Sequence, residues 1–149
     1  MENELKYRVV AWWTSGRAGI AKSDSVPGAI HFTAPAEFGG LEGRWTPEQL
    51  LMTALAGCFT TTFHAVAESS NFEYADLEVE AEGIVSRTEK GYRFSQIVIR
   101  PTLTIQSEEH RGQAIGLLHK AKELCLVSRA LTTPQNCEVR INIKKQCLV

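Results

Sequence analysis

The chain has 149 residues, of which 44% are hydrophobic and 22% charged, and its formal net charge is −1. This length predicts one domain over residues 1–149, large enough to bury a core without disulfide or metal staples. A net charge near zero gives no electrostatic attraction for nucleic acid or an anionic membrane surface, so neither is expected as a partner.

The N-terminus has no basic segment followed by an apolar run, so no signal peptide is expected. No apolar run comes near the ~20 residues that span a bilayer. The expected compartment is therefore the cytoplasm, where thiols stay reduced. The four cysteines (Cys58, Cys125, Cys137 and Cys147) show no Cys-x-x-Cys spacing, so we expect neither a disulfide framework nor a structural zinc site.

Short strands fill the first part of the chain. Residues 5–13 begin with period-two alternation and are rich in β-forming residues, which predicts a strand. In the turn over residues 14–19, two glycines flank Arg17. The Arg17 side chain is either solvated at a hairpin tip or aimed inward, and spacing alone does not decide between these. Two short strands and a glycine-rich loop are predicted next, at 20–23, 29–33 and 34–45.

The central segment predicts a long helix that is apolar nearly all round, which is typical of a helix inside a protein. Thr46 is a good N-cap, Pro47 suits the first turn, and Gln49 completes a capping box. The helix is expected to end near Ser69. Gly57 costs roughly 1 kcal/mol in a helix interior, which a close approach by a second copy of the helix would offset.

The second half predicts a hairpin, a helix and a strand. Residues 74–87 alternate with a row of glutamates on one face, which predicts a strand with a solvated side. A turn at 89–91 leads to an antiparallel return strand. The remaining elements are that return strand, a helix that is followed directly by Cys125, and a last strand, at 92–105, 108–124 and 137–144.

This order of elements predicts an α+β fold in which an antiparallel sheet wraps around a long buried central helix. The helix has no polar side, and a sheet of this size covers only part of it. We therefore expect an interlocked homodimer in which each central helix is covered by its symmetry mate.

Cys58 lies in the middle of the predicted central helix. Most buried cysteines are inert packing, and a reactive one needs a neighbour, such as a cation, that favours the thiolate. His64 follows six residues later, which is ~600° around a helix and places it on the opposite side. His64 is therefore expected to be a core or interface residue rather than a partner of Cys58.

Three segments in register resemble the OsmC/Ohr family of thiol-dependent hydroperoxide reductases. They are Gly16-Arg17-x-Gly19, the run from Thr46-Pro47-Glu48-Gln49-Leu50 to Ala56-Gly57-Cys58-Phe59, and Cys125-x-Val127-Ser128-x-x-Leu131. Their order and spacing match over nearly the whole chain, and the third segment looks closer to the OsmC branch.

The resemblance implies a role for four residues. Cys58 matches the peroxidatic cysteine and Cys125 the resolving cysteine, while Arg17 and Glu48 match the charged pair that organises the pocket. Cys58 would form a sulfenic acid, Cys125 would condense with it to a disulfide, and an external thiol or dithiol would reduce that disulfide. The substrate would be a small hydroperoxide, no metal or organic cofactor is needed, and Phe59, Leu55 and Trp45 are candidate residues of an apolar pocket.

Two features bear on this assignment. If the helix is already regular at Glu48, ten residues place Glu48 ~15 Å from Cys58 along the axis, so either the helix starts late or two subunits share the site. Leu126 stands where many relatives carry proline, which removes a helix stop after Cys125.

Cys137 and Cys147 have no place in the family mechanism. A thiol redox sensor and a non-catalytic binding member of the same fold are the alternative functions.

Overall fold

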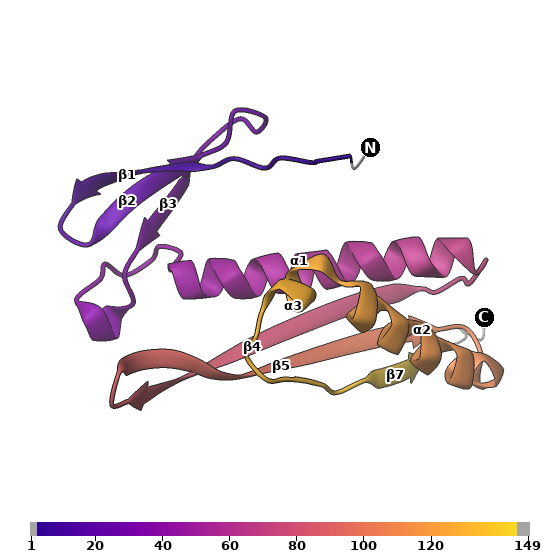
Figure 1. The fold of residues 1–149 in the computed structure, drawn as a ribbon. Helices are drawn as coiled ribbons and strands as arrows, with labels where there is room; N and C mark the ends of the chain where they lie inside the picture. The colour runs from indigo at the N-terminus through magenta and orange to yellow at the C-terminus, as the bar shows by residue number, and fades with distance from the viewer. Residues whose placement is uncertain (1–2, 146–149) are drawn as a thin grey trace. The chain divides into compact units, whose positions relative to one another are not determined.

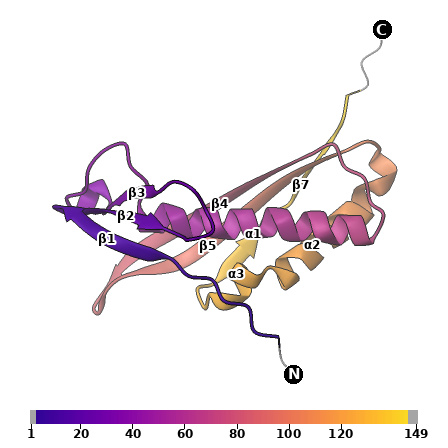
Figure 2. The ribbon, with the colours of Figure 1, turned by 90° about the horizontal axis from the view of Figure 1, so that it is seen from above.

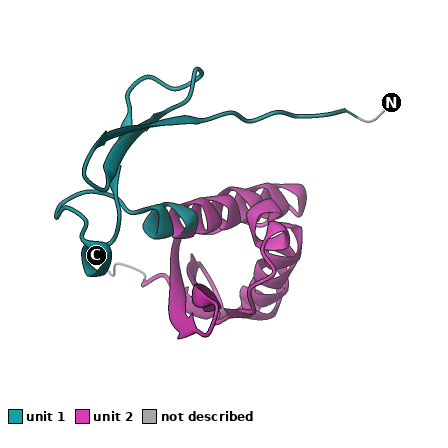
Figure 3. Cartoon of the chain, turned by 60° about the vertical axis from the view of Figure 1, so that its left-hand side comes forward, with its two compact units in different colours: residues 1–51 teal, residues 52–149 magenta. Residues whose placement is uncertain are grey.

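The computed structural model describes residues 3–145, and the chain divides into two compact units, residues 1–51 and 52–149 (Figure 3). Each unit contains its own β-sheet. The single domain over residues 1–149 remains a prediction, and Cys147 lies outside the described residues.

The first unit contains a three-stranded antiparallel sheet in the order β1-β2-β3 (Figure 1). The predicted strand at 5–13 begins only at Val10, which pairs with Lys22, the last residue of the neighbouring strand. The strands are β1 (Val10–Ser15), β2 (Ala18–Lys22) and β3 (Ile30–Thr33). The predicted loop that follows contains one 3-10 turn, η1 (Ala36–Phe38).

Helix α1 (Pro47–Ser69) begins as the sequence predicts. The amide of Thr46 donates to Oε1 of Gln49 at 3.0 Å, and the amide of Gln49 donates to Oγ1 of Thr46 at 3.1 Å. These two bonds form the predicted capping box. The helix ends at Ser69 and is followed by Asn71 with a positive φ of 50°.

The two sides of α1 differ in the second unit. One side lies in the core and contains Leu55, Phe59, Phe63, Val66 and Ala67. The other side is exposed and includes Ala54, Gly57 and His64. The described residues of one chain therefore bury only one side of α1 in this unit.

The length and composition of α1 also suffice to cross a membrane, so the expectation that no apolar run approaches that length is wrong. Length and composition alone are weak evidence of a membrane span, because the core helix of a soluble protein passes the same test.

The sheet of the second unit is built on the predicted hairpin. Strand β4 (Asp76–Thr88) pairs antiparallel with β5 (Gly91–Ile105). The predicted last strand forms two short strands instead, β6 (Gln135–Cys137) and β7 (Arg140–Ile143), and both pair with β5 in parallel. The chain returns to β5 through helices after β5 has ended, and such a crossover connects parallel strands. The sheet is therefore mixed rather than wholly antiparallel.

The outer face of this sheet carries the predicted row of charges. Glu80 and Glu82 are exposed and surround Arg100 at 3.3 and 3.1 Å, and Glu138 approaches the same guanidinium at 3.0 Å. This cluster explains the glutamate row as a solvated sheet face.

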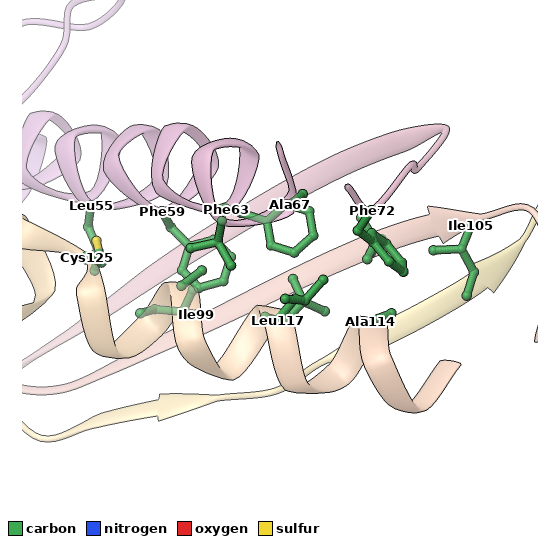
Figure 4. Close-up of a cluster of buried hydrophobic side chains, with 14 of the residues drawn as sticks. Leu55, Phe59, Phe63, Ala67, Phe72, Ile99, Ile105, Ala114, Leu117 and Cys125 are labelled. Atoms are coloured by element: carbon green, nitrogen blue, oxygen red, sulfur yellow. The ribbon is translucent and has the colours of Figure 1, made fainter. Parts of the chain in front are cut away.

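The inner face of the sheet is covered by helices. After η2 (Glu108–His110), helix α2 (Arg111–Leu124) packs with α1 against β5, and a short helix α3 (Leu126–Ala130) follows (Figures 1 and 2). The core formed by these elements contains the side chain of Cys125 (Figure 4). The fold is thus α+β, and Cys125, one of the two predicted site cysteines, is held in its core.

Candidate dithiol site

The structure brings Cys58 and Cys125 together. Cys58 lies in the middle of α1 and is half-buried, whereas Cys125 has no solvent-exposed surface. Their two thiols are hydrogen-bonded to each other. Residues 67 positions apart in the sequence therefore form one dithiol site inside the second unit.

Cys125 occupies the break between α2 and α3. Its backbone is extended, with φ −61° and ψ 113°, so α2 ends at Leu124. The amide of Cys125 still donates to the carbonyl of Ala121 at 2.9 Å, and its carbonyl accepts from the amide of Arg129 at 3.0 Å. Leu126 in place of proline therefore does not prolong the helix, because the break lies at Cys125 itself.

Several polar groups surround the sulfur of Cys58. The backbone amides of Val127 and Leu126, from the start of α3, hydrogen-bond to it. Within α1, Oγ1 of Thr62 lies 3.9 Å from Sγ. With the thiol of Cys125, this gives the sulfur four polar neighbours.

These neighbours control the ionisation of Cys58. Burial raises the pKa of its thiol, but the hydrogen bonds from the Val127 amide, the Cys125 thiol, the Thr62 hydroxyl and the Leu126 amide lower it. The net pKa lies below the ordinary thiol value, because hydrogen bonds to the charged form outweigh the desolvation. Cys58 is therefore predisposed to be a thiolate, the nucleophilic form of cysteine.

Cys125 shows the opposite shift. Burial raises the pKa of its thiol, and so do its hydrogen bond with Cys58 and the charge on Cys58, although the amides of Ser128 and Val127 lower it in part. When one of two coupled thiols ionises, the other is held as the neutral donor. The pair therefore contains one nucleophile, Cys58, and one protonated partner, Cys125.

The two predicted charged residues lie in the first unit. Nη1 of Arg17 donates to the carbonyl of Phe38 at 2.5 Å. Oε2 of Glu48 is buried without a hydrogen-bond partner in the described residues. Arg17 and Glu48 form no ion pair within residues 3–51, so their role as a charged pair that organises the pocket remains a prediction.

The start of α1 bears on the two explanations for the distance between Glu48 and Cys58, a late helix start and a site shared by two subunits. The helix is regular from Pro47, and the amide of Leu50 donates to the carbonyl of Thr46 at 2.9 Å. A late helix start, the first of the two alternatives, is therefore wrong.

The comparisons with known proteins decide the family. Residues 40–140 match the family described as OsmC-like protein. The chain belongs to the OsmC-like family.

Several known proteins resemble this chain over most of its length. The uncharacterized protein YmaD of Bacillus subtilis is 27% identical over 135 residues, which cover 89% of this chain and 90% of that protein. An OsmC-like protein of unknown function from Vibrio cholerae has a similar structure, with a TM-score of 0.80, 19% identity and coverage of 91% and 99%. The organic hydroperoxide resistance protein OhrB of Bacillus subtilis has a TM-score of 0.68, 25% identity and coverage of 92% and 98%. The branch of the family stays a prediction.

Some predicted members of this OsmC-like site have other surroundings. Leu55 and Phe59 have no exposed surface and belong to the core of the second unit, and their place in an apolar substrate pocket remains a prediction. In the first unit, Trp45 lines a shallow pocket of about 260 Å³ with Gly43, Arg44 and Gln49. His64 is exposed, and its Nδ1 lies 2.7 Å from the hydroxyl of Tyr74.

The polar neighbours of Cys58 were not predicted from the sequence. The spacing of Thr62, four residues after Cys58 on one helix, was a visible signal. The amides of Leu126 and Val127 gave no signal, because any residue supplies an amide. Among residues 3–145, no three His, Cys, Asp or Glu side chains gather in a group that can hold a metal ion.

Proposed function

We propose that this protein is a cysteine-based peroxidase that reduces organic hydroperoxides, and hydrogen peroxide less well, in defence against oxidative stress. The observation that carries this proposal is the hydrogen-bonded pair of thiols in which the pKa of Cys58 is lowered and that of Cys125 is raised. Membership in a family that includes hydroperoxide resistance proteins supports it.

The first step oxidises Cys58. Its thiolate attacks one oxygen of the hydroperoxide, the O–O bond breaks, and the alkoxide leaves and takes up a proton to become an alcohol. Cys58 gives up two electrons and becomes a sulfenic acid. The amides of Leu126 and Val127 and the hydroxyl of Thr62 hold the attacking sulfur as a thiolate.

The second step forms a disulfide. The sulfur of Cys125 attacks the sulfur of Cys58, an S–S bond forms, and the hydroxyl of the sulfenic acid leaves as water with the proton of Cys125. An external thiol or dithiol then supplies two electrons and regenerates both thiols. Because the thiols are already in contact, this step requires little movement of the chain.

We assign Arg17 and Glu48 to the same active site. Arg17 would orient the peroxide and support the thiolate, and Glu48 would hold the guanidinium. The buried Oε2 of Glu48 has no hydrogen-bond partner among residues 3–145, and a cation from a second protomer would provide one. With a helix that is regular from Pro47, this arrangement favours a site shared by two subunits.

We also propose a homodimer that acts in the cytoplasm. The outer side of α1 is exposed and contains small residues, and a Cβ atom added at Gly57 would meet nothing within 4 Å in the described residues. No contact among residues 3–145 of one protomer therefore explains a glycine in the middle of this helix. Gly57→Leu should weaken the dimer, as measured by analytical ultracentrifugation, whereas Gly116→Leu on the exposed side of α2 should not. A wild-type monomer would contradict this proposal.

Turnover tests the proposed activity. The purified protein should consume many equivalents of cumene hydroperoxide in the presence of dithiothreitol, and Cys58→Ser should reduce consumption to the rate without protein. A single round of oxidation without turnover would indicate a redox sensor instead. Equal consumption by wild type and Cys58→Ser would overturn the proposed function.

A further inference from the structure

The two amides that face Cys58 come from α3, a helix of only five residues. A helix this short is not stable by itself, so contacts with the rest of the chain must hold it in place. The core accounts for Cys125, which precedes α3. Within α3, Val127 packs beside this core, and the third residue, Ser128, makes a polar contact with another part of the chain.

Ser128 is bound twice by one side chain. It is 4% exposed, and its hydroxyl donates to Oε1 of Gln135. In return, Nε2 of Gln135 donates to the carbonyl of Ser128 at 2.9 Å. The amide group of Gln135 therefore holds both the side chain and the backbone of α3.

Gln135 is itself fixed to the centre of the fold. It begins β6 and pairs with Ile97 of β5, and the amide of Ile97 donates to the carbonyl of Pro134 at 2.9 Å. Ile97 has no exposed surface. A continuous set of contacts thus joins the core strand β5 to Gln135, to Ser128 and to the start of α3.

We propose that Gln135 and Ser128 are positioning residues that hold α3 so that the amides of Leu126 and Val127 face the sulfur of Cys58. This inference rests on the proposed function and adds a specific role for two residues whose side chains hold α3 without contacting the sulfur of Cys58. We call the two hydrogen bonds between Ser128 and Gln135 the clamp. Without the clamp, α3 moves relative to α1, and the sulfur of Cys58 loses hydrogen bonds that favour its thiolate.

A role confined to stability predicts a different result from a positioning role. If the clamp only stabilises the fold, its loss lowers the unfolding temperature and leaves the ionisation of Cys58 in the folded protein unchanged. If the clamp positions the amides, its loss changes the pH dependence of Cys58 reactivity in the folded protein. The pH profile of one thiol therefore separates the two roles.

The experiment measures the alkylation of Cys58 by iodoacetamide from pH 5 to 10, with each cysteine resolved by mass spectrometry. The variants are Gln135→Leu, Ser128→Ala and the double variant. The control is Asn136→Leu, an exposed neighbour on β6. Thermal unfolding confirms that each variant is folded at the assay temperature.

Gln135→Leu should move the Cys58 profile to higher pH and slow alkylation at pH 7 by about fivefold to tenfold, as expected for loss of hydrogen bonds to a charged group. Ser128→Ala should act in the same direction, and the double variant should slow the reaction no more than Gln135→Leu alone. At pH 10 the rates should converge. Asn136→Leu should match wild type.

Profiles that stay at the wild-type position in folded Gln135→Leu and Ser128→Ala would overturn the proposal, and so would an equal shift in Asn136→Leu. If Gln135→Leu does not fold, Ser128→Ala, which removes one oxygen atom, decides the matter alone. Alkylation needs no peroxide, so this result is independent of whether the protein is a peroxidase.

Discussion

Cys58 and Cys137 are both half-buried thiols of the second unit, yet their surroundings differ. Cys137 packs beside the core from β6, and burial raises the pKa of its thiol, with only a partial opposing effect from the charge of Lys122. Cys58 is also desolvated, but its hydrogen bonds reverse the effect. Polar contacts, rather than burial, therefore distinguish the thiol with a lowered pKa from the thiol with a raised pKa in this protein.

The largest expected effect comes from removing either Cys125, the partner of Cys58, or Cys137. Cys125→Ser should abolish disulfide formation, so that Cys58 accumulates as sulfenic acid and, with excess peroxide, gains a second oxygen to become sulfinic acid. Cys137→Ser should form the disulfide as wild type does. Mass spectrometry of each variant after peroxide treatment measures both products. Loss of the disulfide in Cys137→Ser would show that Cys137 takes part in its formation, against this account.

The pH dependence of alkylation should also separate the two thiols. The lowered pKa of Cys58 means that at a given pH a larger fraction of this thiol is ionised than of an ordinary thiol. The raised pKa of Cys137 delays its ionisation to higher pH. As pH rises, Cys58 should therefore be alkylated first and Cys137 later. The reverse order would show that the hydrogen bonds do not control the Cys58 thiol.

The smallest expected effect comes from one hydroxyl. Thr62→Val removes the group 3.9 Å from the Cys58 sulfur and should slow alkylation at pH 7 by about fivefold, which corresponds to about 1 kcal/mol. The matched control is Thr61→Val, because the hydroxyl of Thr61 donates to the carbonyls of Gly57 and Cys58 instead. Equal rates in the two variants would exclude Thr62 as a thiolate donor.

Local signals in the sequence predicted much of the fold. The capping box at Thr46 and Gln49 was correct because it involves residues three apart, and the β4–β5 hairpin was correct because alternation and turn chemistry are local. The division of the last strand into β6 and β7 and their parallel pairing with β5 were not predicted. The end of α2 at Leu124 was predicted, but the helix α3 beyond the break at Cys125 was not.

The site was predictable to a smaller extent. The pairing of Cys58 with Cys125 followed from family resemblance, since no spacing rule joins residues so far apart. The amides of α3 and the clamp between Ser128 and Gln135 depend on tertiary packing around β5, which the pattern of residues does not encode locally. The joint role of Arg17 and Glu48 stays a prediction for the assembled protein.

The most direct test of the central claim, that Cys58 and Cys125 act as one dithiol, is to add one equivalent of an organic hydroperoxide to the fully reduced protein. After blocking of free thiols and proteolysis, mass spectrometry identifies which cysteines are linked. We predict rapid and stoichiometric formation of an intrachain disulfide between Cys58 and Cys125, with Cys137 alkylated and therefore free. Oxidation of another cysteine, or no reaction at Cys58, would contradict this account.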